Sequence, residues 1–170
     1  TKVRCDGGDT WGIQIGPGVT GTLLNGVEVG GGANGTTNTG VGSGILFGDN
    51  SGSAFNNQAN HVWVHHCIDG LRADGNCWFR QSKVTNMDTS GYRGDGTGTH
   101  GDGSQQTGWG GSKFTHSYID GGNNDALFFN QEGGNPAIGE VIIDNCVVNG
   151  YTGSQPGGPP DTWRSSYGIR

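Results

Sequence analysis

Three aspartates in this sequence each stand directly before a small residue. Asp69 and Asp102 precede glycines, Asp125 precedes an alanine, and His100 lies two residues before Asp102. Carboxylates that stack in a repeated structure can bind calcium, and they can raise one another's pKa until one serves as an acid or a base. Asp69, Asp102 and Asp125 are therefore candidate calcium ligands, and His100 and Asp102 are candidate catalytic groups.

The aspartates belong to a repeat in which glycine or alanine is followed by a residue that can face a core. Its six copies begin at Gly12, Gly44, Gly70, Gly103, Ala126 and Gly168. Successive copies are 32, 26, 33, 23 and 42 residues apart, which fits β-solenoid coils with loops of variable length. No helical periodicity accompanies the repeat, so the elements that position the aspartates are predicted to be strands.

A second set of short, alternating apolar segments lies between these copies. Each segment is bounded by Gly, Asn or Asp, which tolerate the left-handed conformations of turns. The segments are 23–27, 62–67, 78–82, 114–118 and 141–146. Two alternating strand families predict two faces of one coil, with each strand paired in parallel to its equivalent in the next coil.

Strand alternation places one residue of each repeat copy on the outer face of the coil. The predicted outer column is Gln14, Leu46, Arg72, Gln105, Phe128 and Arg170. Equivalent strands lie about 4.8 Å apart in a parallel ladder, so Arg72, Gln105 and Phe128 could contact successive parts of one sugar chain. An ordinary solvated face is the alternative interpretation of this column.

The segment 100–105 is the most polar copy of the repeat, because Ser104 replaces the apolar core residue of the other copies. It follows the long insertion 88–95 and is therefore the predicted centre of an active site. The alternative for Asp69, Asp102 and Asp125 is structural: they stand at a corner of the coil, where aspartate side chains hydrogen-bond the turn backbone.

Loops that leave the second strand family are expected to gather on one edge of the solenoid. They carry the aromatic and cationic residues Tyr92, Arg93, Tyr151 and Trp163. Aromatic rings cover the apolar faces of pyranoses, and planar donors meet hydroxyls and carboxylates. We expect these four residues to bind a glycan substrate together with Gln105 and Phe128.

The composition excludes two classes of partner. The chain has a formal net charge of -6, and its nine Lys and Arg residues are scattered, so nucleic acid is not expected to bind. No segment has the roughly 18 consecutive apolar residues of a membrane span, so membrane insertion is not expected. Four cysteines without a CxxC pair indicate no structural metal site.

Three stretches resemble the repeats of right-handed parallel β-helix proteins, the pectate-lyase-like proteins and phage tail spikes. They are WGIQIGPGVTGT at 11–22, NHVWVHHC and IDGLRADGNCW at 60–78, and THGDGSQ at 99–105. The resemblance implies an all-β, right-handed parallel β-helix of about six coils with variable loops. Residues 1–170 are expected to form a single β-helix domain that is a piece of a longer chain or assembly.

The resemblance also implies a function at a cell or virion surface. The expected protein is extracellular and binds or acts on polysaccharide or cell-surface glycan, as a polysaccharide lyase, hydrolase or epimerase. His100 and Asp102 would then supply acid–base chemistry, Arg72 would neutralise substrate charge, and calcium is the implied cation. The alternative is a non-catalytic structural or receptor-binding segment of a phage tail or surface protein, assembled as a homotrimer or a larger virion assembly.

Overall fold

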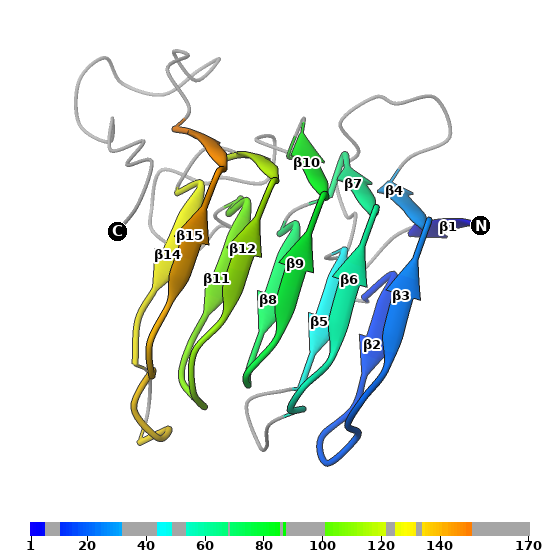
Figure 1. The fold of residues 1–170 in the computed structure, drawn as a ribbon. Helices are drawn as coiled ribbons and strands as arrows, with labels where there is room; N and C mark the ends of the chain where they lie inside the picture. The colour runs from blue at the N-terminus through cyan, green and yellow to red at the C-terminus, as the bar shows by residue number, and fades with distance from the viewer. Residues whose placement is uncertain are drawn as a thin grey trace, which may run out of the picture.

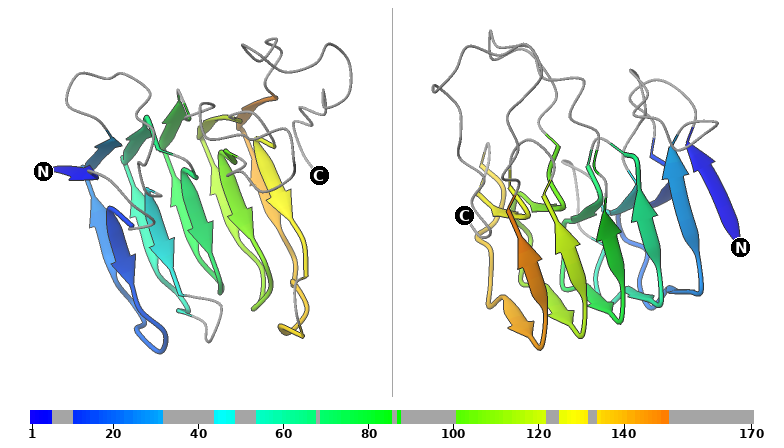
Figure 2. Two further views of the ribbon diagram at one scale, coloured as in Figure 1. Left: turned by 180° about the vertical axis from the view of Figure 1, so that it is seen from behind. Right: turned by 90° about the horizontal axis from the view of Figure 1, so that it is seen from above.

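The computed structural model describes residues 1–5, 11–31, 44–48, 54–67, 69–85, 87, 101–121, 125–131 and 134–150. All regular elements within these ranges are β-strands of three or four residues. The strands stack as successive coils along one axis (Figure 1), and Figure 2 shows the same stack from two further sides. In this part of the chain no helix is long and apolar enough to cross a membrane.

The strands form three parallel sheets, which we name A, B and C. Sheet A contains β1 (Lys2–Cys5), β4 (Glu28–Gly31), β7 (Trp63–His65), β10 (Lys83–Thr85), β13 (Tyr118–Asp120) and β16 (Val147–Asn149). Sheet B contains β2 (Ile13–Ile15), β5 (Ile45–Phe47), β8 (Leu71–Ala73), β11 (Ser104–Gln106) and β14 (Leu127–Phe129). Sheet C contains β3 (Leu23–Asn25), β6 (Gln58–Asn60), β9 (Trp78–Arg80), β12 (Lys113–Thr115) and β15 (Ile142–Asp144).

The chain passes through the sheets in the constant order B, C, A, so each coil has three strands. This architecture is the parallel β-helix predicted from the sequence. The described residues form five such coils, preceded by β1, and the sixth copy of the repeat, at Gly168, lies outside the described residues. The prediction of two faces for each coil was wrong, because the second strand family divides between sheets C and A.

Sheets C and A are separated by a two-residue corner that was not predicted from the sequence. In every described coil, two residues separate the strand of sheet C from the strand of sheet A. The first of the two has a left-handed backbone: Gly26, His61, Gln81, His116 and Asn145 have φ values of 63, 52, 49, 51 and 51°. Each bends the chain in the same direction, and Gln81 N–H, for example, donates to the Thr115 carbonyl at 2.9 Å.

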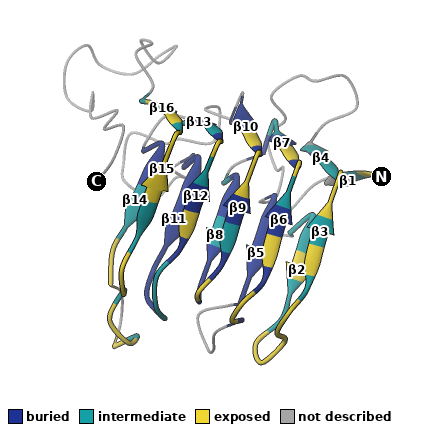
Figure 3. Cartoon of the chain, in the orientation of Figure 1, coloured by how far each residue is buried: buried dark blue, intermediate teal, exposed yellow. Residues whose placement is uncertain are grey.

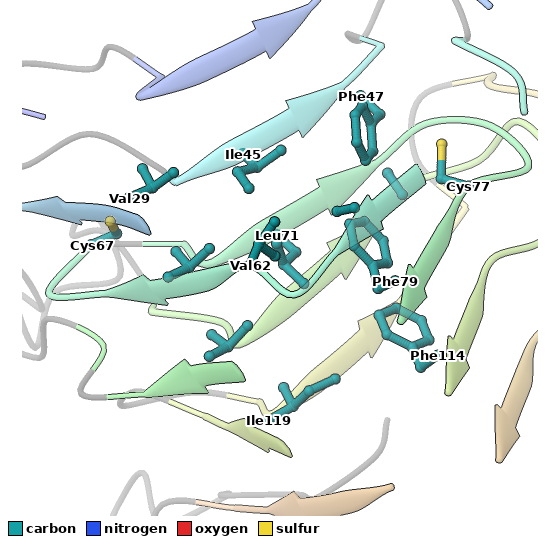
Figure 4. Packing of buried hydrophobic residues seen from close by; sticks show 14 of the residues in the cluster. Val29, Ile45, Phe47, Val62, Cys67, Leu71, Cys77, Phe79, Phe114 and Ile119 are labelled. Carbon is teal, nitrogen blue, oxygen red and sulfur yellow. The ribbon is translucent and has the colours of Figure 1, made fainter. Parts of the chain in front are cut away.

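The core lies between the three sheets and is built from side chains that point inward in register. Phe79 stacks between Phe47 and Phe114, with ring centroids 5.7 and 5.2 Å away, as Figure 4 shows. Val64 and Leu71, from sheets A and B, are fully buried. Figure 3 shows that burial is greatest in the middle coils. Complete burial of side chains of this size stabilises the fold by roughly 1.5–3 kcal/mol each.

Glycine precedes the strands β5, β8 and β11 of sheet B because a side chain has no space there. A β-carbon on Gly70 would contact the Gly103 carbonyl oxygen of the next coil and would lie 2.5 Å from Val84 Cγ1. On Gly103 it would lie 2.5 Å from the Asp120 carbonyl oxygen. The glycine repeat of the sequence therefore marks the corner between sheets A and B, where backbone packs directly on sheet A.

We predict that Gly70→Ala destabilises the protein by about 1–3 kcal/mol, because the added methyl overpacks this corner. Gly16→Ala is the control, since a β-carbon there has no atom within 4 Å. It should change the free energy of unfolding by less than about 0.5 kcal/mol. Urea unfolding measures the free energy of unfolding of both variants. Equal values would contradict the packing role of the glycines before sheet B.

Candidate functional site

The predicted outer column of sheet B is present in the expected register from Gln14 to Phe128, and its last member, Arg170, lies outside the described residues. Gln14 pairs with Leu46, Leu46 with Arg72, Arg72 with Gln105, and Gln105 with Phe128. Its middle is not an open face, however: Leu46 and Gln105 are only 3% and 5% exposed, and Arg72 and Phe128 are half-buried. The roles of Arg72, Gln105 and Phe128 toward a substrate stay predictions.

The aspartate column is also present, and the carboxylates of Asp69 and Asp102 accept hydrogen bonds from backbone N–H groups. Asp69 Oδ1 accepts from Asp102 N–H at 3.2 Å, and Asp102 Oδ1 accepts from Asp125 N–H at 3.0 Å. Such contacts are of the kind that the structural alternative predicts, and the calcium-binding and catalytic roles of the aspartates stay predictions. In the described part of the chain, no three His, Cys, Asp or Glu side chains come together to hold a metal ion.

Several predicted site residues lie outside the described residues. They are His100, Tyr92, Arg93, Tyr151 and Trp163. The acid–base role of His100 and Asp102 and the gathering of the loop residues on one edge therefore stay predictions. Asp102 itself is fully buried.

A buried charged cluster next to Arg72 was missed by sequence reasoning. Asp74 Oδ1 accepts from Thr107 Oγ1 at 3.0 Å, and Asp74 Oδ2 lies 3.4 Å from Arg72 Nε. Arg72 Nη2 also donates to Thr107 Oγ1 at 3.1 Å. Burial raises the pKa of Asp74, and this effect outweighs the opposing effect of Arg72. The sequence signal that could have revealed this cluster is the spacing of Arg72 and Asp74, which lie two residues apart at the end of β8.

A groove at the corner between sheets B and C is a second feature that the sequence did not reveal. Its cavity volume is about 430 Å³. The lining comes from four successive coils, from the segments that lead into β6, β9, β12 and β15. The lining residues are Asn56, Asn57, Gln58, Asn76, Cys77, Trp78, Gly110, Gly111, Lys113, Gly139 and Glu140.

Hydrogen bonds between coils hold the groove side chains in place. Trp78 Nε1 donates to Thr115 Oγ1 at 2.8 Å, and the Arg80 guanidinium lies 5.6 Å from the Trp78 ring centroid. Asn76 Oδ1 accepts from Gly111 N–H at 2.8 Å. The groove thus offers a fixed aromatic ring beside exposed amides and charged groups, an arrangement that can bind a polar ligand with apolar faces.

The chain was compared with protein-family models, with curated proteins and with solved structures. None of the three comparisons gave a match. One fold can carry many unrelated functions, so the parallel β-helix alone does not assign an activity. The groove is the feature of the described residues on which a functional interpretation can be built.

Asp74 should make the stability of the protein depend on pH. A carboxyl whose pKa is raised on folding binds its proton more tightly in the native state. Its contribution is complete below the unfolded-state pKa of about 3.9 and is lost as the pH rises through the higher native pKa. Asp74→Asn removes this titration, so the variant should lose less stability than the wild type between pH 4 and 8.

Urea unfolding at several pH values measures the free energy of unfolding, and its slope against pH is compared between the variant and the wild type. Asp144→Asn is the control, because Asp144 is an exposed carboxylate on sheet C. This variant makes the same change of charge at the surface and so separates the effect of the Asp74 position from that of a lost negative charge. The prediction would be wrong if the free energy of unfolding of Asp74→Asn changed with pH as steeply as that of the wild type.

Proposed function

We propose that this protein binds a polysaccharide or cell-surface glycan in the groove at the corner of sheets B and C. The observation that carries the proposal is the placement of Trp78 beside exposed amide and charged side chains. An aromatic ring can cover the apolar face of a pyranose, while Asn76 and Lys113 can hydrogen-bond its hydroxyls. Asn56 and Gln58 add further exposed amides on the preceding coil.

The length of the groove supports a chain of sugars as the ligand. Four coils contribute to its lining, and coils repeat about every 4.8 Å, so the lining extends for about 14 Å along the axis. Equivalent positions on successive coils can then contact successive sugar units. A single monosaccharide would occupy only part of this length.

The charges of the groove favour a neutral sugar chain. Lys113 and Glu140 line it with opposite signs, so neither a cationic nor an anionic ligand is selected locally. The whole chain carries a formal net charge of -6, which repels a strongly acidic polysaccharide at low ionic strength. Neutral polysaccharides are therefore the first ligands to test.

Binding of this kind is common to both functions expected from the sequence. A polysaccharide lyase, hydrolase or epimerase must hold its substrate, and a receptor-binding segment of a phage tail or surface protein must hold its glycan. Catalysis through His100, Asp102 and Arg72 is a separate prediction. Glycan binding in the groove depends neither on that activity nor on where the protein is located.

We predict that Trp78→Ala lowers the affinity for a bound polysaccharide at least tenfold. Trp63→Ala is a matched control: Trp63 is also partly exposed, and its Nε1 donates to a threonine of the next coil, Thr85 Oγ1, at 3.0 Å. It lies on sheet A, away from the groove residues. Affinity electrophoresis and calorimetry with a panel of neutral and acidic polysaccharides measure the effect.

Two outcomes would contradict the proposal. One is the absence of binding by the folded wild-type protein to any member of the panel. The other is equal affinity of Trp78→Ala and the wild type. Assays of the same incubations for new reducing ends and for unsaturated uronic-acid ends, with and without calcium, distinguish binding from cleavage.

A further inference from the structure

Two consecutive histidines at the end of β7 bring their ring nitrogens together. His65 Nδ1 and His66 Nδ1 lie 2.7 Å apart, and the two rings are perpendicular with centroids 5.0 Å apart. Only one proton fits between two nitrogens at this distance, so at least one of them presents its lone pair to the other. When both imidazoles carry their proton on Nε2, both lone pairs converge on the same space.

The surroundings of His65 favour that tautomer. Glu28 Oε1, on the adjacent strand β4, lies 3.4 Å from His65 Nε2. The Glu28 carboxylate is an acceptor and is itself held by Lys2 Nζ at 3.0 Å. A proton on His65 Nε2 can point to this carboxylate, which leaves Nδ1 with a free lone pair.

The His65 ring is also fixed in position. It lies over Gly30 of β4, where a β-carbon would collide with the imidazole. The Trp63 ring packs against it, with centroids 4.3 Å apart, and the His65 side chain is only 15% exposed. His66 is held by a left-handed backbone with φ of 52°. The two nitrogens therefore converge because of the packing of sheet A.

We propose that His65 and His66 bind a divalent transition metal ion through their two Nδ1 atoms. Imidazole nitrogens bind such ions at about 2.0–2.1 Å, which places two ligands of a tetrahedral ion about 3.4 Å apart. The rings need to separate by less than about 1 Å to reach this geometry. Water completes the coordination, and Glu28 acts as the carboxylate partner of a metal-bound histidine.

The chemistry of the donors selects the ion. Imidazole suits Cu²⁺, Ni²⁺ and Zn²⁺, whereas Ca²⁺ and Mg²⁺ prefer oxygen ligands. Affinity should follow the usual order, with Cu²⁺ the tightest. His61 and His116 do not form a second pair, because Gln81 stands between them in the corner column, which separates their backbones by about 10 Å.

Titration calorimetry with Ni²⁺ and Zn²⁺ tests the site in the reduced full chain. We expect one ion per chain and at least a tenfold loss of affinity in His66→Asn. Asparagine fits this backbone, since Asn145 has a φ of 51°. His116→Asn is the matched control, because His116 has the same left-handed conformation and should bind the metal as the wild type does.

Two further variants test the geometry while keeping both imidazoles. Gly30→Ala displaces the His65 ring and should weaken binding, and Glu28→Gln should weaken it about 10–100-fold by removing the carboxylate partner. Electron paramagnetic resonance of the Cu²⁺ complex should show coupling to two nitrogens in the wild type and to one in His66→Asn. Failure of the wild type to bind one ion, or equal binding by His66→Asn, would overturn the proposal.

Discussion

The structure depends on one constraint: each strand pairs in parallel with its equivalent strand one coil away. The backbone hydrogen bonds of this ladder fix the register of the coils, so every side chain lies directly above or below its counterpart. Like residues therefore form columns. The phenylalanine stack, the aspartate corner and the glycine corner are three columns produced by the same ladder, and the groove arises where four coils present their corners together.

Part of this arrangement could be predicted from the sequence, and the reason is steric. Gly44, Gly70 and Gly103 recur because the corner before sheet B leaves no space for a β-carbon, and an unavoidable glycine is easily recognised. The sequence thus identified sheet B with its correct register. The corner before sheet A was missed because Gln81, for example, adopts a left-handed conformation that usually belongs to Gly, Asn, Asp or His.

The sites were harder to predict than the fold, because their residues share no local motif. Trp78 and Lys113 meet at the groove only through the pairing of β9 with β12, and Asp74 contacts Thr107 across 33 positions of sequence. The outer column was predicted in the right register, but not the burial of Leu46 and Gln105. Burial depends on the packing of whole coils, whereas alternation is a property of single strands.

The constant corner between sheets C and A contrasts with the connections from sheet A to sheet B. The latter range from five residues after β7 to 18 after β10, while the strands on either side keep their register. The free energy needed to close a loop rises only slowly with its length. Peptides can therefore be inserted at these connections, in nature or by design, without changes to the hydrophobic core. The inserted peptides would lie in a row, at the fixed spacing of the coils.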